Sequence, residues 1–171
     1  KIIIVGGGPA GLEAARVSAE RGHDVHLYEA TSKLGGQLNY ASKINWRRDL
    51  GGIIDWLISE CEILGVHFHM NYMVEHIDII DKNIDVVILA TGGMPNTNLI
   101  DGDAEVLSTW DALSGKKLEG LVFIHDETGK NVALTAADYQ SDNGSEVILN
   151  TPDATIGMEA MRMEISPFMK R

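Results

Sequence analysis

Apolar residues in the first part of the chain form two kinds of pattern, short continuous runs and runs with helical spacing. Residues 2–5 read Ile-Ile-Ile-Val, which is typical of a central parallel strand covered on both faces. Residues 12–21 are rich in good helix formers, and Gly22 ends this stretch. Residues 24–29 alternate apolar and polar positions and predict a second strand. Residues 47–64 carry apolar side chains at spacings of three and four, which predicts an amphipathic helix.

Strand and helix patterns continue to alternate along the rest of the chain. Residues 66–70 and 85–90 predict two further strands, with an extended excursion between them at 71–85. The order strand, helix, strand then recurs at residues 121–124, 131–142 and 146–149. We therefore predict an α/β fold with a parallel sheet, followed by an incomplete second unit of the same layout.

A polar stretch rich in Gly, Asn and Asp separates these two patterns. It covers residues 94–119 and contains one short predicted helix near 109–113. We place the domain boundary in it, with a first domain over residues 1–113 and a partial second domain over 114–171. The chain starts with Lys directly at a strand, and residues 157–171 read as a helix just under way. We therefore expect the chain to be a segment of a longer polypeptide.

The turn after the first strand carries glycines at the spacing that a dinucleotide requires. Gly6 permits a tight turn, Gly8 lets the backbone approach a pyrophosphate, and Gly11 lets the following helix pack closely on the strand. Glu29 lies 18 residues beyond Gly11, near the position of the acid that binds a ribose 2′-OH. This order predicts a Rossmann-like site for an adenine nucleotide, and a bare α/β turn is the alternative. The predicted contacts are Gly6, Gly8, Pro9, Ala10, Gly11, Glu29 and Ala30.

Charge and cysteine content exclude several other classes of protein. The net charge of −11 opposes binding to nucleic acid or to an anionic membrane surface. No stretch approaches the roughly 20 apolar residues of a membrane span. The single cysteine, Cys61, excludes an internal disulfide and a multi-cysteine metal or iron–sulfur site within the chain, and it fits a cytoplasmic location.

Three further segments carry a resemblance to a known family: Gly35-Gly36-Gln37-Leu38, Leu89-Ala90-Thr91-Gly92, and residues 108–115 leading into Val122-Phe-Ile. With the glycine turn, they make the chain similar to flavoproteins of the glutathione-reductase type. More narrowly, the chain resembles the C-terminal module of the trimethylamine dehydrogenase and 2,4-dienoyl-CoA reductase family. In that family, a barrel related to old yellow enzyme precedes the module and carries FMN and a 4Fe-4S cluster.

The resemblance implies a site for FAD, or for ADP alone, in a flavin-dependent oxidoreductase of the amine dehydrogenase, demethylase or enoate reductase type. It implies two partners, the barrel domain of the same full-length chain and an electron-transfer protein as acceptor. It also adds site residues: Gly36, Gln37 and Leu38 near the pyrophosphate or flavin, Met73 and Val74 at the adenine, and Ala90, Thr91 and Gly92 at the end of the next strand.

The turn of the second strand–helix–strand pattern departs from the nucleotide-binding plan. Residues 124–131 read Ile-His-Asp-Glu-Thr-Gly-Lys-Asn, with one glycine and two acids where a pyrophosphate would approach. We therefore expect no NAD(P) binding at this turn, which favours the demethylase and amine dehydrogenase branch. Two alternatives remain, a structural ADP-binding module and an NAD(P)H-binding reductase domain.

The remaining candidate residues have plain structural interpretations. His67 and His69 share one strand face, but we expect neither a carboxylate nor a third histidine beside them, and therefore no metal site. Cys61 falls on the apolar stripe of its helix and is expected to be a buried, inert thiol. Arg47 and Arg48 are interpreted as a solvated helix start. We expect no catalytic residue in the chain, because the redox chemistry of such a module belongs to its cofactor.

Overall fold

A computed structural model describes residues 1–75, 83–96, 105–115, 118–166 and 168. The chain divides into two compact units, residues 1–93 and residues 94–171, called here the first and the second unit. Each unit is considered by itself. In the described residues, no helix is both long and apolar enough to cross a membrane.

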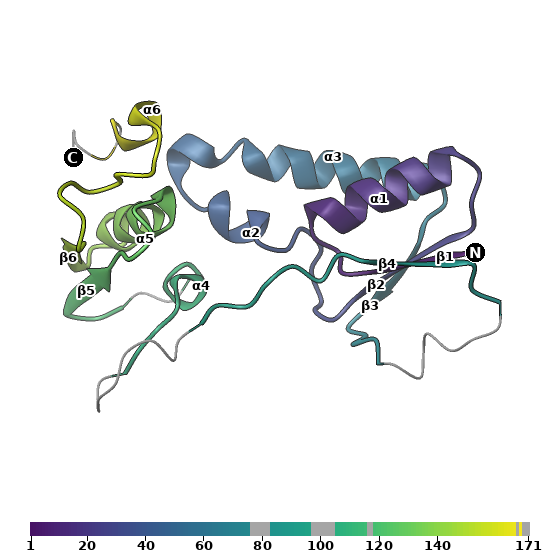
Figure 1. The fold of residues 1–171 in the computed structure, drawn as a ribbon, viewed down its shortest axis with the longest axis horizontal. Helices are drawn as coiled ribbons and strands as arrows, with labels where there is room; N and C mark the ends of the chain where they lie inside the picture. The colour runs from purple at the N-terminus through teal and green to yellow at the C-terminus, as the bar shows by residue number, and fades with distance from the viewer. Residues whose placement is uncertain (76–82, 97–104, 116–117, 167, 169–171) are drawn as a thin grey trace. The chain divides into compact units, whose positions relative to one another are not determined.

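The first unit is built on a parallel four-stranded sheet in the order β3-β2-β1-β4, as Figure 1 shows. Its strands are β1 (Ile2–Val5), β2 (Val25–Glu29), β3 (His67–Met70) and β4 (Val86–Leu89). Its helical segments are α1 (Pro9–Glu20), α2 (Leu38–Ala41), η1 (Asn45–Arg47) and α3 (Leu50–Ile63). The predicted parallel α/β fold is confirmed. The predicted excursion at 71–85 lies partly outside the described residues.

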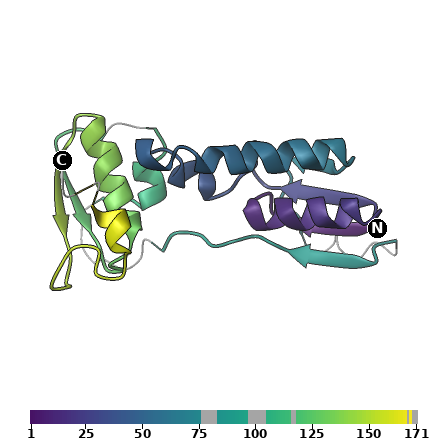
Figure 2. The same cartoon turned by 90° about the horizontal axis from the view of Figure 1, so that it is seen from above.

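Helices α1 and α3 run alongside each other on one face of this sheet (Figures 1 and 2). The core forms between that face and the helices, because alternate strand residues such as Ile4 and Leu27 point toward Leu12 of α1 and Leu57 of α3. Burying four or more such side chains contributes roughly 1.5–3 kcal/mol each. The core fixes the strand register, and the register fixes where each strand ends.

The second unit contains a parallel pair of strands, β5 (Leu121–His125) and β6 (Glu146–Asn150), connected by α5 (Asn131–Asp142). The predicted second strand–helix–strand pattern is therefore present. Helix α4 (Thr109–Ala112) packs on α5, and α6 (Arg162–Ile165) is a single short turn. The helix expected to begin near residue 157 is thus restricted to four residues.

The division between the units lies earlier than the boundary predicted between residues 113 and 114. Helix α4 belongs with the second unit because Gln140 of α5, which is fully buried, donates its amide N–H to the carbonyl of Ala112. The same side chain accepts a hydrogen bond from Leu118 N at 3.2 Å. The sequence pattern marks the polar connection but does not reveal this long-range contact.

Candidate nucleotide-binding site

The predicted site residues come together at the carboxyl edge of the first unit's sheet. Because β1, β2, β3 and β4 are parallel, the segments that follow them meet at one edge. Hydrogen bonds fix their order: Gly6 N donates to Tyr28 O, and Ala90 N donates to Val5 O, each at 2.8 Å. The segment after β3 joins them, since Tyr72 N donates to Glu29 O at 2.9 Å.

Two glycines of the turn are required by the packing of the protein itself. Gly6 has a φ of +107°, and a Cβ there would lie 2.3 Å from the carbonyl oxygen of Ala90. A Cβ on Gly11 would lie 1.9 Å from the carbonyl oxygen of Gly6. Both distances are far below contact, so any side chain at Gly6 or Gly11 would force α1 and the turn away from the sheet.

Gly8 differs, because nothing in the described protein crowds it. Its backbone is extended, with φ −74° and ψ 179°, which any residue can adopt. A Cβ there would meet only the Cα of Gly36, at 4.0 Å, whereas a Cβ on Gly36 would lie 3.1 Å from the Cα of Gly8. The two glycines face each other, and Gly35 N holds their loops together by donating to Gly7 O at 2.8 Å. We call the bare backbone surface that Gly8 and Gly36 form together the glycine cradle.

Helix α1 presents a bare N-terminus to this cradle. Its N-cap residue is Gly8, no side chain caps it, and its first turn contains no acid. Pro9 occupies the first helical position, where its missing N–H costs nothing. Backbone N–H groups and the positive end of the helix dipole are thus available to an anion. The glycine cradle and the helix start together fit a pyrophosphate.

Glu29 lies at the end of β2 beside the turn. Its Oε2 accepts a hydrogen bond from Gly7 N, and its Oε1 accepts from the N–H and the hydroxyl of Thr31, all at 2.8 Å. An ionised carboxylate offers about four acceptor positions, so three donors leave room for one more, such as a ribose hydroxyl. The neighbouring Ala30 is exposed. No local pattern in the sequence predicts that Gly7 and Thr31 hold this carboxylate.

The other predicted residues surround the same edge with different exposure. Gln37, Thr91 and Gly92 are exposed, and Gln37 Nε2 donates to Gly93 O at 3.4 Å, which connects the two loops. The side chains of Leu38 and Ala90 are partly buried and pack against the hydrophobic core. Met73 is exposed and Val74 is half-buried, directly after the Tyr72 contact to Glu29.

Comparison with known proteins shows which fold and family the chain has. The family described as "NAD(P)-binding Rossmann-like domain" matches residues 4–57. The chain is 45% identical over 172 residues to a "Probable N-methylproline demethylase" of Rhizobium meliloti (strain 1021), covering 99% of this chain and 25% of that protein. It is 45% identical over 160 residues to the "Multifunctional alkene reductase/demethylase OYE" of Caballeronia cordobensis, covering 93% of this chain and 24% of that protein.

A solved complex of 2-naphthoyl-CoA reductase matches 99% of this chain and 26% of its own, with a TM-score of 0.90 and 29% identity. The chain belongs to the trimethylamine dehydrogenase and 2,4-dienoyl-CoA reductase family. It spans about a quarter of the length of the curated relatives it matches. Within this family of flavin-dependent oxidoreductases, the chain corresponds to a Rossmann-like nucleotide-binding module.

The second unit's turn is arranged differently from that of the first. Asp126 is only 2% exposed, and its Oδ1 accepts hydrogen bonds from Thr128 N, Thr128 Oγ1 and Gly129 N at 3.0–3.1 Å. Its other oxygen, Oδ2, is buried and has no hydrogen-bond partner among the described residues. The protein's own carboxylate therefore occupies two backbone N–H groups of the loop before α5 and places a buried acidic side chain beside them. This turn does not fit the pyrophosphate of NAD(P).

The histidines of β3 correct one expectation from the sequence. Parallel pairing of β2 with β3 places His26 opposite His67, and Asp24 stands just before β2. A carboxylate and a third histidine therefore do lie beside His67 and His69. Burial lowers the pKa of both His26 and His69 below the ordinary histidine value. The spacing of Asp24 and His26 already places both side chains on one face of their strand. The sequence does not show that this strand pairs with the strand of His67 and His69.

Cys61 and the paired arginines have structural roles. Cys61 is fully buried, its Sγ lies 3.4 Å from the carbonyl oxygen of Leu12, and burial raises its pKa to about 11. The predicted buried thiol is confirmed. The Arg47 guanidinium stacks 4.4 Å above the Trp46 ring, and Arg48 donates to Asn45 Oδ1 at 2.7 Å. These contacts hold both arginines in their own helical turn.

Proposed function

We propose that the first unit binds FAD through its ADP half. One observation carries this proposal, namely the glycine cradle. The close packing of the turn accounts for Gly6 and Gly11, whereas none of the described residues requires Gly8 to lack a side chain. A ligand that approaches the backbone closely would explain why position 8 is a glycine.

The neighbouring groups fit the two ends of an ADP moiety. The uncapped start of α1 offers N–H donors to the pyrophosphate, and the Glu29 carboxylate has an acceptor position left for a ribose hydroxyl. The backbone after Tyr72, at Met73 and Val74, lies on the Glu29 side and suits the adenine. FAD bound here would supply two-electron redox chemistry, while these residues hold and orient it.

We further propose that the whole protein is a demethylase or amine dehydrogenase. The relatives' names support this reaction class, since both of those described above include demethylase activity. The substrate would react in a barrel domain of the same full-length chain that carries FMN and a 4Fe-4S cluster. The turn that contains Asp126 binds its own carboxylate through two backbone N–H groups. This favours electron transfer to another protein over electron transfer to a nicotinamide. A cytoplasmic location is part of the same proposal.

A second candidate is a structural module that binds ADP without carrying electrons. It is favoured by one observation: the described residues that converge on the cradle all suit the adenosine diphosphate half of FAD. Under this proposal, the nucleotide would join the loops after the four strands and stabilise them by mass action.

The two candidates separate when the nucleotides released from the purified full-length protein are identified. We expect chromatography of a heat-released extract to yield FAD together with FMN. ADP without FAD would favour the structural module instead. In Gly8→Val, the added side chain would cover the bare backbone of the cradle, so we expect FAD to be lost while FMN in the barrel is retained. If Gly8→Val keeps its full adenine nucleotide content, the ligand binds elsewhere and the proposal fails.

A further inference from the structure

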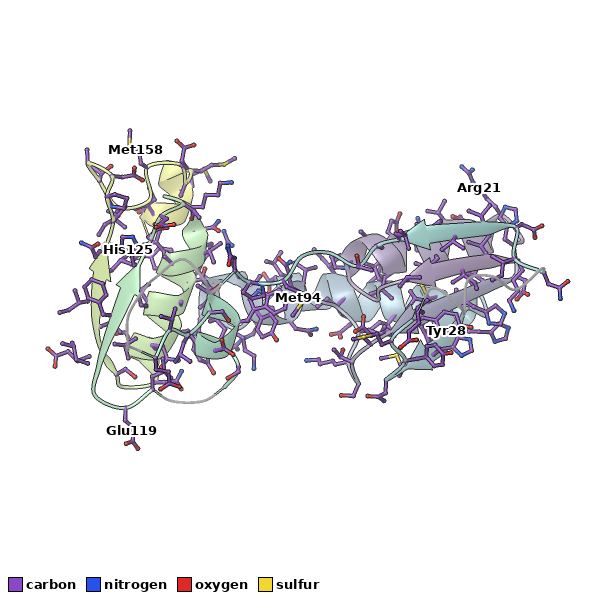
Figure 3. The ribbon with its side chains drawn as sticks, turned by 60° about the horizontal axis from the view of Figure 1, so that its bottom comes forward. Arg21, Tyr28, Met94, Glu119, His125 and Met158 are labelled. Atoms are coloured by element: carbon purple, nitrogen blue, oxygen red, sulfur yellow. The ribbon has the colours of Figure 1, made fainter. Side chains whose placement is uncertain are left out.

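Four ring-bearing side chains and one acid gather on the sheet face that α1 and α3 leave uncovered. On β2 and β3 the core-facing side chains include Val25, Leu27 and Phe68. Alternation along each strand therefore directs the histidines of these strands to the other face. Figure 3 labels Tyr28, which belongs to the same face. The members of the group are Asp24, His26, Tyr28, His67 and His69.

Three of these residues present ligand atoms to one point. Asp24 Oδ1 lies 3.3 Å from His26 Nε2 and 3.9 Å from His67 Nε2. The ligand atoms of Asp24, His26 and His67 all lie within 4.8 Å of one another. Ligands about 2.0–2.1 Å from a tetrahedral Zn²⁺ are roughly 3.3 Å apart. The Asp24–His26 distance meets this value, and rotation of the exposed His67 side chain can shorten the others.

A fourth residue, His69, orients the central ligand. His26 Nδ1 and His69 Nε2 are 2.9 Å apart, which is hydrogen-bond distance. The His69 ring stacks on Tyr28 with centroids 4.3 Å apart and an interplanar angle of 12°, which fixes its orientation. When His26 donates its Nδ1–H to His69, its Nε2 lone pair faces the Asp24 carboxylate. In this tautomer, a cation bound between Nε2 and the carboxylate would be held by both, at atoms 3.3 Å apart.

We propose that Asp24, His26 and His67 bind a divalent transition-metal ion of the Zn²⁺ type. Two imidazoles and one carboxylate form a donor set that suits Zn²⁺ and is a poor one for Mg²⁺ or Ca²⁺. Water would complete the tetrahedron. The ion would connect β2 to β3, the edge strand of the sheet, and His69 would act as a positioning residue for His26. Asp24 precedes β2, so this site is separate from the nucleotide site at the strands' carboxyl ends.

Zinc binding by the full-length protein tests the proposal. The protein is treated with EDTA, passed over a desalting column and dialysed against ZnCl₂, and bound zinc per chain is measured by metal analysis. We expect wild type to bind one more zinc than His67→Gln, with at least a hundredfold loss of affinity in the variant. Substitution of a residue that only hydrogen-bonds to a metal ligand typically lowers the metal affinity about 10–100-fold, so loss of a ligand itself should cost more. His23→Gln is the matched control, because His23 is exposed, precedes Asp24 and lies outside the cluster.

Two further variants distinguish a ligand from a structural residue. His67→Cys should restore zinc binding, because a thiolate is itself a zinc ligand. His69→Leu should weaken binding about 10–100-fold, while His69→Gln, which keeps an acceptor for His26, should weaken it less. Retention of adenine nucleotide reports that each variant is folded. The proposal is overturned if wild type and His67→Gln bind the same amount of zinc, or if His67→Cys binds no better than His67→Gln.

Discussion

The two strand–turn–helix segments of this chain begin alike and end in opposite chemistry. In both, a parallel strand leads through a short turn into a twelve-residue helix whose N-cap makes no side-chain hydrogen bond. In the first segment, the turn consists of glycines, and no acidic or capping side chain lies at the helix start next to Gly8. In the second, Asp126 folds back and accepts hydrogen bonds from Thr128 N and Gly129 N. No side chain caps the start of α1, whereas the loop before α5 uses two of its backbone N–H groups to bind Asp126.

This difference shows that the loop before a helix helps to decide whether an anion can bind there, because the helix starts of α1 and α5 are both without a side-chain cap. The dipole of a helix contributes about 0.3–1 kcal/mol per charge in exposed positions, and α1 and α5 are both twelve residues long. A built-in carboxylate uses this contribution first and adds a negative charge that repels a phosphate. The same fold can therefore carry one site that fits a nucleotide and one turn that excludes it.

The strongest test of the first turn is Gly11→Ala. The new Cβ would lie 1.9 Å from the Gly6 carbonyl oxygen, so α1 must move from the sheet. We expect a loss of about 3 kcal/mol or more in stability, at the upper end of overpacking effects, together with loss of adenine nucleotide. Thermal unfolding of the full-length protein measures it. Gly52→Ala on the exposed face of α3, where nothing lies within 4 Å, should be neutral or stabilising. Equal melting of Gly11→Ala and wild type would contradict the packing account.

The matched change Gly8→Ala should separate binding from folding. A Cβ at Gly8 meets only ordinary contact with Gly36 at 4.0 Å, so we expect the stability of the nucleotide-free protein to change little. It would nevertheless stand where the pyrophosphate approaches. We expect the affinity for FAD to fall about a hundredfold, which corresponds to about 2.8 kcal/mol. Rebinding of FAD to the nucleotide-depleted protein, followed by fluorescence quenching, measures this. A parallel loss of stability would show that Gly8, too, is a packing glycine.

In the second turn, Asp126→Ala should lower stability by about 1–2 kcal/mol. The substitution leaves the N–H groups of Thr128 and Gly129 without their acceptor. Asp126→Asn retains an acceptor oxygen in the same place and should cost less. Denaturant unfolding compares the two, and the adenine nucleotide content should be unchanged in both. If Asn is as damaging as Ala, the carboxylate acts through its charge and not through these two bonds.

The smallest effect is expected in an NADH titration. Because Asp126 occupies the donors of its own turn, the second unit should bind NADH weakly in the wild type. Asp126→Ala frees the N–H groups of Thr128 and Gly129, but the turn still has only one glycine, so we expect the affinity to rise by no more than a few-fold. Isothermal calorimetry on the full-length protein provides the measurement. Tight NADH binding that Asp126→Ala abolishes would reverse the comparison and make the second turn a nucleotide site.

Much of the first site was predictable because its residues are close together in sequence. Gly6 and Gly8 lie in the loop after β1, and Gly11 lies in the first turn of α1. Their spacing in the sequence is therefore enough to predict how they are placed relative to one another. Glu29 follows from the length of one strand–helix–strand unit. The role of Gly36 opposite Gly8 was expected only by resemblance, since no local pattern brings these two loops together.

The local periodicity of the sequence determined the strands, the helices and the identity of the glycine turn. Pairing and packing decided the rest. The β2–β3 register placed Asp24 and His26 beside His67, although His26 and His67 are 41 positions apart along the chain. The contact of Gln140 with Ala112 assigned α4 to the second unit. The physical reason is the same in each case: hydrophobic patterns specify which face is buried, whereas strand order and long-range hydrogen bonds specify which distant residues become neighbours.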